Sequence, residues 1–190
     1  MTIGATVIGC RIVIATIFAG SATSKISSRA RFDAFSDWLA DLHRTPSAAM
    51  QPLAMAVVLA EAGITLCLGL SLVRGARSDG FAQAGSLSAA GLLLVFAFST
   101  AILIRSGTSV RCMCFGRRGV PLGMRHIIRD LALASVAGVG SADISGALSF
   151  DERLVLMEIA VAIGTIVMFL DDIFALLSPW PDRRADALER

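Results

Sequence analysis

Residues 82–104 read AQAGSLSAAGLLLVFAFSTAILI, a run without a single charged side chain. A helix that crosses the hydrocarbon core of a bilayer needs about 20 consecutive, mostly apolar residues. This segment therefore predicts a transmembrane helix. Four further stretches have the same character, so we predict five spans, at about 3–24, 51–73, 82–104, 126–142 and 154–177.

The composition of the 190-residue chain also indicates a membrane protein. Hydrophobic residues make up 55% and charged residues 17%, with a mean hydropathy of +0.74, whereas soluble domains average about 45–50% apolar and about 25% charged residues. Small residues are dense in 82–104 and 126–142, and small faces let helices pack closely in lipid. The predicted fold class is an all-α, polytopic membrane helix bundle, with a four-helix core and an additional fifth span.

Residues 25–49 predict an amphipathic helix that does not span the membrane, because apolar side chains recur at helical spacing between charged ones. Such a helix lies in the membrane interface; the alternative is a solvated helix that packs on its own bundle. The apolar side chains at this spacing are Phe32, Phe35, Trp38, Leu39 and Leu42. We therefore divide the chain into a bundle at 1–142, an additional transmembrane helix at 143–177 and a polar tail at 178–190.

The basic residues are distributed unevenly between the two sides of this arrangement. Five spans place 25–50, 105–125 and 178–190 on one side, which holds twelve of the seventeen Lys and Arg residues, while the opposite side holds three. The positive-inside rule would place the richer side in the cytoplasm. Disulfide chemistry on an exported client requires the outer face instead, because cytosolic thiols are kept reduced. If the fifth span is absent or re-entrant, the bias falls to nine against six, and the exported face is favoured.

Two thiols stand one residue apart, at Cys112 and Cys114. A Cys-x-Cys pair closes a small, strained disulfide ring, and strain makes a disulfide easier to reduce. Arg111 and Arg117 are the nearest of several arginines around the pair, and cationic neighbours favour the thiolate, which is the reacting form. The pair therefore predicts a thiol–disulfide exchange site.

Two other interpretations of the cysteine pair remain open. The thiols are either idle loop residues, or they bind a metal together with His126. A closed zinc site usually needs four ligands, and nothing in the spacing demands His43 as the fourth, so we assign no metal site. The sequence shows no nucleotide, haem or flavin motif, which leaves a quinone as the one cofactor that we consider.

The string Cys-Met-Cys-Phe-Gly at 112–116, followed by Arg129-Asp130 in the next predicted helix, resembles the MauE family. These are membrane proteins of methylamine utilisation, with wider DoxX-like relatives. The family usually shows Cys-Gly-Cys-Phe-Gly. Met113 replaces the glycine here, which reduces the backbone freedom between the thiols.

Further residues match elements of that family in the same order, namely Arg11 in the first span, Lys25 at its end and Glu61 in the second. The resemblance covers about residues 5–142. It implies a four-helix, redox-linked bundle in a bacterial plasma (inner) membrane. It also implies that the protein assists disulfide formation or thiol reduction for an exported client, alongside a thioredoxin-like partner.

Our first hypothesis is therefore a multi-pass membrane thiol–disulfide redox protein or accessory factor. Its Cys-x-Cys pair would exchange electrons with a thioredoxin-like protein or a quinone, supporting the maturation of an exported client. The alternative is a non-catalytic membrane subunit or assembly factor of a larger complex, and a transporter is a third possibility. The expected partners are the lipid bilayer and these proteins, with no nucleic acid.

Two charges fall inside predicted spans, Arg11 in the first and Glu61 in the second, at depths that differ by roughly 5 Å. An unpaired charge there costs at least about 2.5–3.5 kcal/mol. We therefore predict that Arg11 and Glu61 are in contact and tie two helices together. Arg129-Asp130 predicts a similar tie near the cysteine loop.

Overall fold

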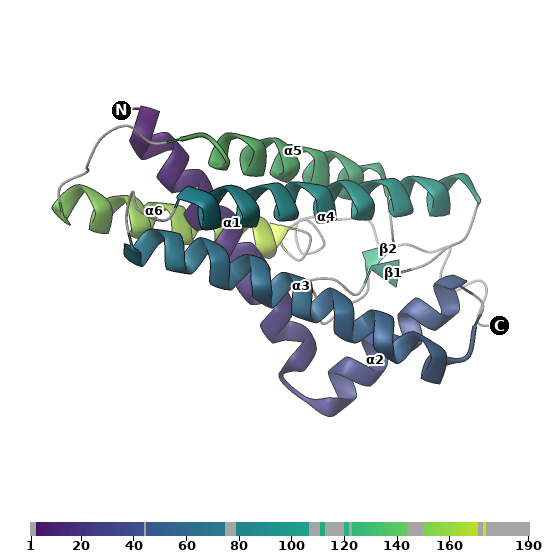
Figure 1. Ribbon diagram of the computed structural model, residues 1–190. Coiled ribbons are helices and arrows are strands. Elements are labelled where there is room, and N and C mark those ends of the chain that lie inside the picture. The colour runs from purple at the N-terminus through teal and green to yellow at the C-terminus, as the bar shows by residue number, and fades with distance from the viewer. Residues whose placement is uncertain are drawn as a thin grey trace.

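The computed structural model describes residues 3–43, 45–74, 79–106, 111–112, 120–121, 123–143, 150–170 and 173. These ranges form a helical bundle with one very short antiparallel ladder (Figure 1). The predicted helical membrane bundle is confirmed. The elements are α1 (Ile3–Ile26), α2 (Arg29–His43), α3 (Ser47–Arg74), α4 (Asp79–Arg105), β1 (Arg111–Cys112), β2 (Val120–Pro121), α5 (Met124–Gly140) and α6 (Phe150–Met168).

Among the described residues, three helices are long and apolar enough to cross a membrane, namely α1, α3 and α4. The fourth predicted span, 126–142, corresponds to α5, which has 17 residues. The fifth, 154–177, corresponds to α6, which starts at Phe150 and has 19 residues, with Asp151 and Glu152 in its first turn. Both are shorter than the three long helices, and membrane crossing by α5 and α6 remains a prediction.

Helix α1 lies at the centre of the bundle and contacts each of the other five helices. It runs antiparallel to α3 and α5 and crosses α3, so that its last turn lies beside the middle of that helix, where Lys25 meets Glu61 (Figure 1). Helix α4 ends where α5 begins. We call this the hairpin end, because β1 and β2 connect α4 to α5 there. Apolar side chains from four helices fill the middle of the bundle. They are Ile14, Ile17, Phe18, Ile64, Leu68, Ala89, Leu93, Leu133, Ala134 and Ala137.

The amphipathic helix predicted in residues 25–49 is present as α2, from Arg29 to His43. Its apolar face is buried inside the protein, where Phe35 and Leu39 form a cluster with Ala54 of α3. Burying a large apolar side chain contributes about 1.5–3 kcal/mol. The structure thus shows that this helix packs on its own bundle, and its place in the membrane interface remains a prediction.

Helix α6 runs parallel to α1, and glycines make the approach close. Gly20 of α1 lies directly against Met168. A Cβ added at Gly164 would stand 3.0 Å from the Cβ of Thr16 and 3.2 Å from the carbonyl oxygen of Val13. These distances leave no room for a larger residue at Gly20 or Gly164, so the close α1–α6 contact depends on glycine at both positions.

We predict that Gly164→Ala destabilises the bundle, because overpacking of a tight contact costs about 1–3 kcal/mol. Gly63→Ala is the matched control. Nothing lies within 4 Å of a Cβ at Gly63, and alanine is the better helix former by about 1 kcal/mol. Thermal unfolding in detergent, followed by circular dichroism, should show a lower midpoint for Gly164→Ala only. Equal midpoints for the two variants would contradict the close α1–α6 contact.

Candidate functional site

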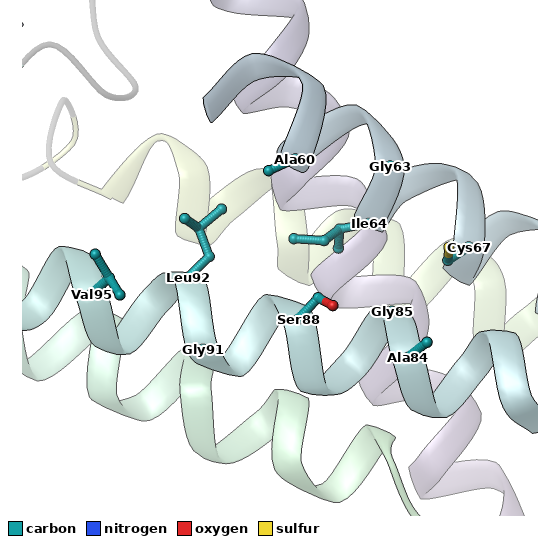
Figure 2. A pocket seen from close by; sticks show the side chains of 10 residues that line it. All are labelled: Ala60, Gly63, Ile64, Cys67, Ala84, Gly85, Ser88, Gly91, Leu92 and Val95. Carbon is teal, nitrogen blue, oxygen red and sulfur yellow. The ribbon is translucent and has the colours of Figure 1, made fainter. Parts of the chain in front are cut away.

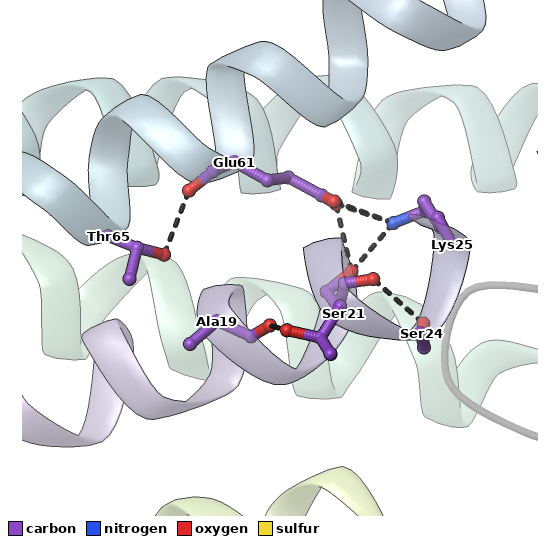
Figure 3. Close-up of polar contacts among 7 residues, drawn as sticks. Ala19, Ser21, Ser24, Lys25, Glu61 and Thr65 are labelled. Atoms are coloured by element: carbon purple, nitrogen blue, oxygen red, sulfur yellow. Dashed lines mark hydrogen bonds and ion pairs between the residues drawn. The ribbon is translucent and has the colours of Figure 1, made fainter. Parts of the chain in front are cut away.

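A closed triangle of hydrogen bonds joins Ser21 and Lys25 of α1 to Glu61 of α3 (Figure 3). The Lys25 Nζ donates to both carboxylate oxygens of Glu61, at 2.7 and 2.8 Å. It also donates to the Ser21 Oγ at 2.7 Å, and that hydroxyl donates to the Glu61 Oε1 at 2.9 Å. An ammonium group has three N–H donors, and each one has an acceptor here.

The ion pair is sealed from solvent, since the side chains of Lys25 and Glu61 are 3% and 1% exposed. The Phe35 ring of α2 covers the ammonium group, with its centroid 5.1 Å from the Nζ. A cation over an aromatic face gains about 0.5–2 kcal/mol. Three helices therefore contribute to this one site, and α2 acts as its cover.

The predicted contact between Arg11 and Glu61 is wrong. The Arg11 Nε donates to the Gly140 carbonyl at 2.8 Å, and its Nη2 donates to the Ala142 carbonyl at 2.9 Å. Arg11 precedes Ser21 by ten residues, which is about 15 Å along a helix. The end of α5 supplies Arg11 with carbonyl groups that lack helical partners and carry partial negative charge.

The N-terminal turn of α5, at the hairpin end, contains a second set of buried polar groups. The backbone N–H of Gly123, the N-cap, donates to the His126 Nδ1 at 3.1 Å, and the backbone N–H of His126 donates back to the Gly123 carbonyl at 3.0 Å. Asp130 lies one turn further along, and both side chains are buried. Arg129 donates to the Asp130 Oδ1 at 3.3 Å. This contact joins neighbours within α5, and the predicted tie between helices stays a prediction.

The cysteine loop is anchored by the backbone pairing of β1 and β2. Arg111 pairs with Pro121, and Cys112 pairs with Val120, in antiparallel register. Val120 precedes the N-cap of α5 by three residues, so the Cα of Cys112 lies within roughly 16 Å of the Cα of Gly123. Cys114 and Arg117 lie outside the described residues, as do the side chains of Arg111 and Cys112.

The predicted site residues thus lie in three places. Lys25 and Glu61 pair where the end of α1 meets the middle of α3. Arg129 and Asp130 lie in the second turn of α5, near the hairpin end. Arg11 lies at the opposite end, next to the last turn of α5. Ser21, Phe35 and the capping role of His126 were not predicted. The signal for Ser21 was its position one turn before Lys25, which puts both side chains on one face of the helix.

An open, apolar groove of about 480 Å³ lies between α3 and α4 (Figure 2). Small residues line most of it, including Gly63, Gly85 and Ser88. Cys67 also lines it and, like Cys10, is a half-buried free thiol. No group of three or more possible metal ligands occurs among the residues that the structure describes.

The family model described as methylamine utilisation protein MauE matches residues 3–143, which include the hairpin and every helix except α6. Neither a curated protein nor a solved structure matches the chain. The match therefore covers the Lys25–Glu61 pair, the Arg11 contact and the cysteine loop together.

We predict energetic coupling between Lys25 and Glu61. Removing one partner of a buried ion pair costs about 3–5 kcal/mol, because the other charge stays buried without a counter-charge. The double variant Lys25→Met, Glu61→Gln should therefore lose less free energy of unfolding than the two single variants together. Denaturant unfolding in detergent measures the three differences.

The matched control is the cycle of Arg11→Gln with Glu61→Gln. These side chains share no hydrogen bond and lie far apart, so their effects should add to within about 0.5 kcal/mol. Additivity in the Lys25–Glu61 cycle would show that the pair is not formed in the folded protein.

Proposed function

Because this chain belongs to the MauE family of membrane proteins involved in methylamine utilisation, we propose that it is a membrane thiol–disulfide redox protein or accessory factor. Cys112 and Cys114 cycle between a dithiol and a disulfide. Electrons pass to or from a soluble thioredoxin-like partner or a membrane quinone. The exchange supports the maturation of an exported client, and the protein resides in the plasma membrane of a bacterium.

The observation that carries this proposal is the pairing of Cys112 with Val120. It ties the first cysteine of the Cys-x-Cys pair to the segment that leads into α5. A reactive thiol pair benefits from a fixed backbone, because its reactivity depends on nearby charge and on access.

Both proposed reactions balance without a further reagent. With a thioredoxin-like partner, the two thiols of this chain reduce the partner's disulfide through a mixed disulfide, and this chain acquires the S–S bond. With a quinone, two S–H bonds break and one S–S bond forms, while two electrons and two protons convert the quinone to the quinol. The protein is oxidised in these two reactions. The reverse of the first closes the cycle: a reduced thioredoxin-like partner returns two electrons and two protons to the disulfide of this chain and itself acquires the S–S bond.

We predict that the Cys112–Cys114 pair responds to redox conditions. Maleimide labelling after mild reduction should add two labels at these positions and lose both after oxidation, because a disulfide has no free thiol to react. Cys10 and Cys67, which are free, serve as internal controls, and Cys112→Ser with Cys114→Ser removes the signal. Identical labelling in both conditions would favour the non-catalytic subunit or assembly factor.

A separate prediction concerns the side of the membrane on which the cysteine loop lies. Chemistry on an exported client needs the cysteine loop on the outer face, because thiols in the cytosol are kept reduced. A membrane-impermeant thiol reagent should therefore reach Cys112 and Cys114 in intact cells whose disulfides have been reduced. Protection of both thiols until the cells are lysed would place the loop in the cytoplasm and exclude an exported client.

A further inference from the structure

Helix α6 touches the rest of the bundle along one narrow seam, where it packs against α1. The residues of this seam are buried or half-buried and recur at each turn of the helix. They are Leu156, Ala160, Gly164, Val167 and Met168. The other described residues of α6 are exposed, and many of them are large and apolar, such as Val155, Ile159 and Ile163. Most of the helix surface is therefore open to contact with lipid or with another protein.

The exposed surface of α6 carries a carboxylate, that of Glu158, near the middle of the helix. Glu158 stands eight residues after the start of α6 and ten before its end. The two helices are parallel and Leu156 lies opposite Gly9, so Glu158 is level with about Arg11 of α1. That level lies within the length of α1, which is long and apolar enough to cross a membrane.

Glu158 points away from the bundle. It lies two residues from Leu156 and two from Ala160, which is about 160° around the helix from each of these seam residues. Among the described residues, Glu158 has no hydrogen bond or ion pair. Arg153 lies seven residues before Ala160 and therefore on the seam side of the helix. A charged side chain at membrane depth almost always faces a protein partner or a water-filled cavity, so Glu158 calls for a partner outside this bundle.

Small and polar residues follow Glu158 along the same side of α6. The exposed residues on this side recur at alternating spacings of three and four, the repeat by which two helices pack along their length. They are Val155, Glu158, Ala162, Thr165 and Phe169, and we call them the outer stripe. The Thr165 Oγ1 donates to the Val161 carbonyl at 2.8 Å, and its lone pairs remain able to accept. Small residues and hydroxyl groups are enriched where helices meet in membranes.

We propose that the outer stripe is a docking surface for one transmembrane helix of another protein, which carries a lysine or arginine at the level of Glu158. The carboxylate pairs with that cation, Ala162 lets the two backbones approach closely, and Thr165 accepts a hydrogen bond two turns further along. Helix α6 lies outside the residues 3–143 that the family model matches. The docking surface is thus separate from the thiol chemistry proposed above and does not rest on it.

A second copy of this chain is a poorer match for the outer stripe. Copies in one membrane share an orientation, so a two-fold contact through the stripe sets Glu158 opposite Glu158, and like charges this close disfavour each other. Arg153 faces the other side of α6. Arg11, which lies at the level of Glu158, is buried and bonded to carbonyl groups of its own chain. Charge complementarity therefore favours a partner of different sequence.

The test uses the full-length protein in lipid vesicles, with synthetic transmembrane helices as probes. Each probe has about 20 leucine and alanine residues, with a lysine, a leucine or a glutamate at its centre. Energy transfer between fluorescent labels on the protein and the probe gives the association constant. The lysine probe should bind about 5- to 30-fold more tightly than the leucine probe, which is the range for one polar contact between helices in lipid.

Four variants locate the contact. Glu158→Gln should remove most of the preference for lysine, and Glu158→Lys should transfer it to the glutamate probe. Glu152→Gln is the matched control, because it makes the same change in the first turn of the same helix and should keep the preference. Ala162→Ile should weaken the binding of every probe, because the larger side chain prevents close approach.

The unfolding midpoint of each variant without a probe separates docking from folding. Glu158 is exposed and has no partner among the described residues, so Glu158→Gln should leave the midpoint unchanged while it alters binding. A lower midpoint for Glu158→Gln would show that the carboxylate serves its own bundle and would contradict the proposal.

Two other results would also overturn the proposal. Equal binding of the lysine and leucine probes would assign the outer stripe to lipid. Energy transfer between two labelled copies of the chain, lost in Ala162→Ile and unaffected by the lysine probe, would assign the stripe to a second copy. Neither result bears on the labelling of Cys112 and Cys114, so this inference and the proposed function fail independently.

Discussion

A charged side chain inside an apolar bundle must find its partner within the protein, and α1 carries two such side chains. Lys25 finds the carboxylate of Glu61 on α3, and Arg11 finds the terminal carbonyl groups of α5. Each contact fixes the level at which a neighbouring helix crosses α1. Since α1 contacts every other helix, these two contacts set the register of the whole arrangement.

The two cations are satisfied in chemically different ways. Carbonyl groups at a helix end are fixed dipoles, and two of them accept hydrogen bonds from Arg11. Glu61 is a carboxylate that shares a hydroxyl with Lys25. The Arg11 contact therefore sets a charge against dipoles, whereas the Lys25 contact is a buried ion pair. Apolar packing around Ile17 and Leu68 keeps the two apart.

The sequence was sufficient for the parts of the fold that depend on local pattern. Runs of apolar residues marked α1, α3 and α4, and periodicity marked α2, because both properties belong to single helices. The partner of Glu61 was not predictable in the same way. Counting depth from loop ends matched Arg11 to Glu61, whereas Lys25 stands at the end of α1, where it was assigned to no partner. Only the packing of α1 on α3 shows that its side chain turns inward.

Other structural features could not be predicted from the sequence, for related reasons. A two-residue strand such as Arg111–Cys112 has no periodicity, so the ladder with Val120–Pro121 has no local signature. The close contact between Gly20 and Met168 joins segments far apart in the chain. A glycine in the sequence does not indicate which residue will pack against it. The amphipathic pattern of α2 gave the right helix, but an apolar face looks the same whether lipid or α3 covers it.

The position of α1 at the start of the chain has a consequence for how the protein is made. The carboxylate that Lys25 needs is encoded 36 residues later, and the carbonyl group that Arg11 needs comes 129 residues later. At a synthesis rate of about 5–20 residues per second, Arg11 waits roughly 6–26 s for α5. The two contacts of α1 therefore form in a fixed order during synthesis, the one with α3 before the one with α5.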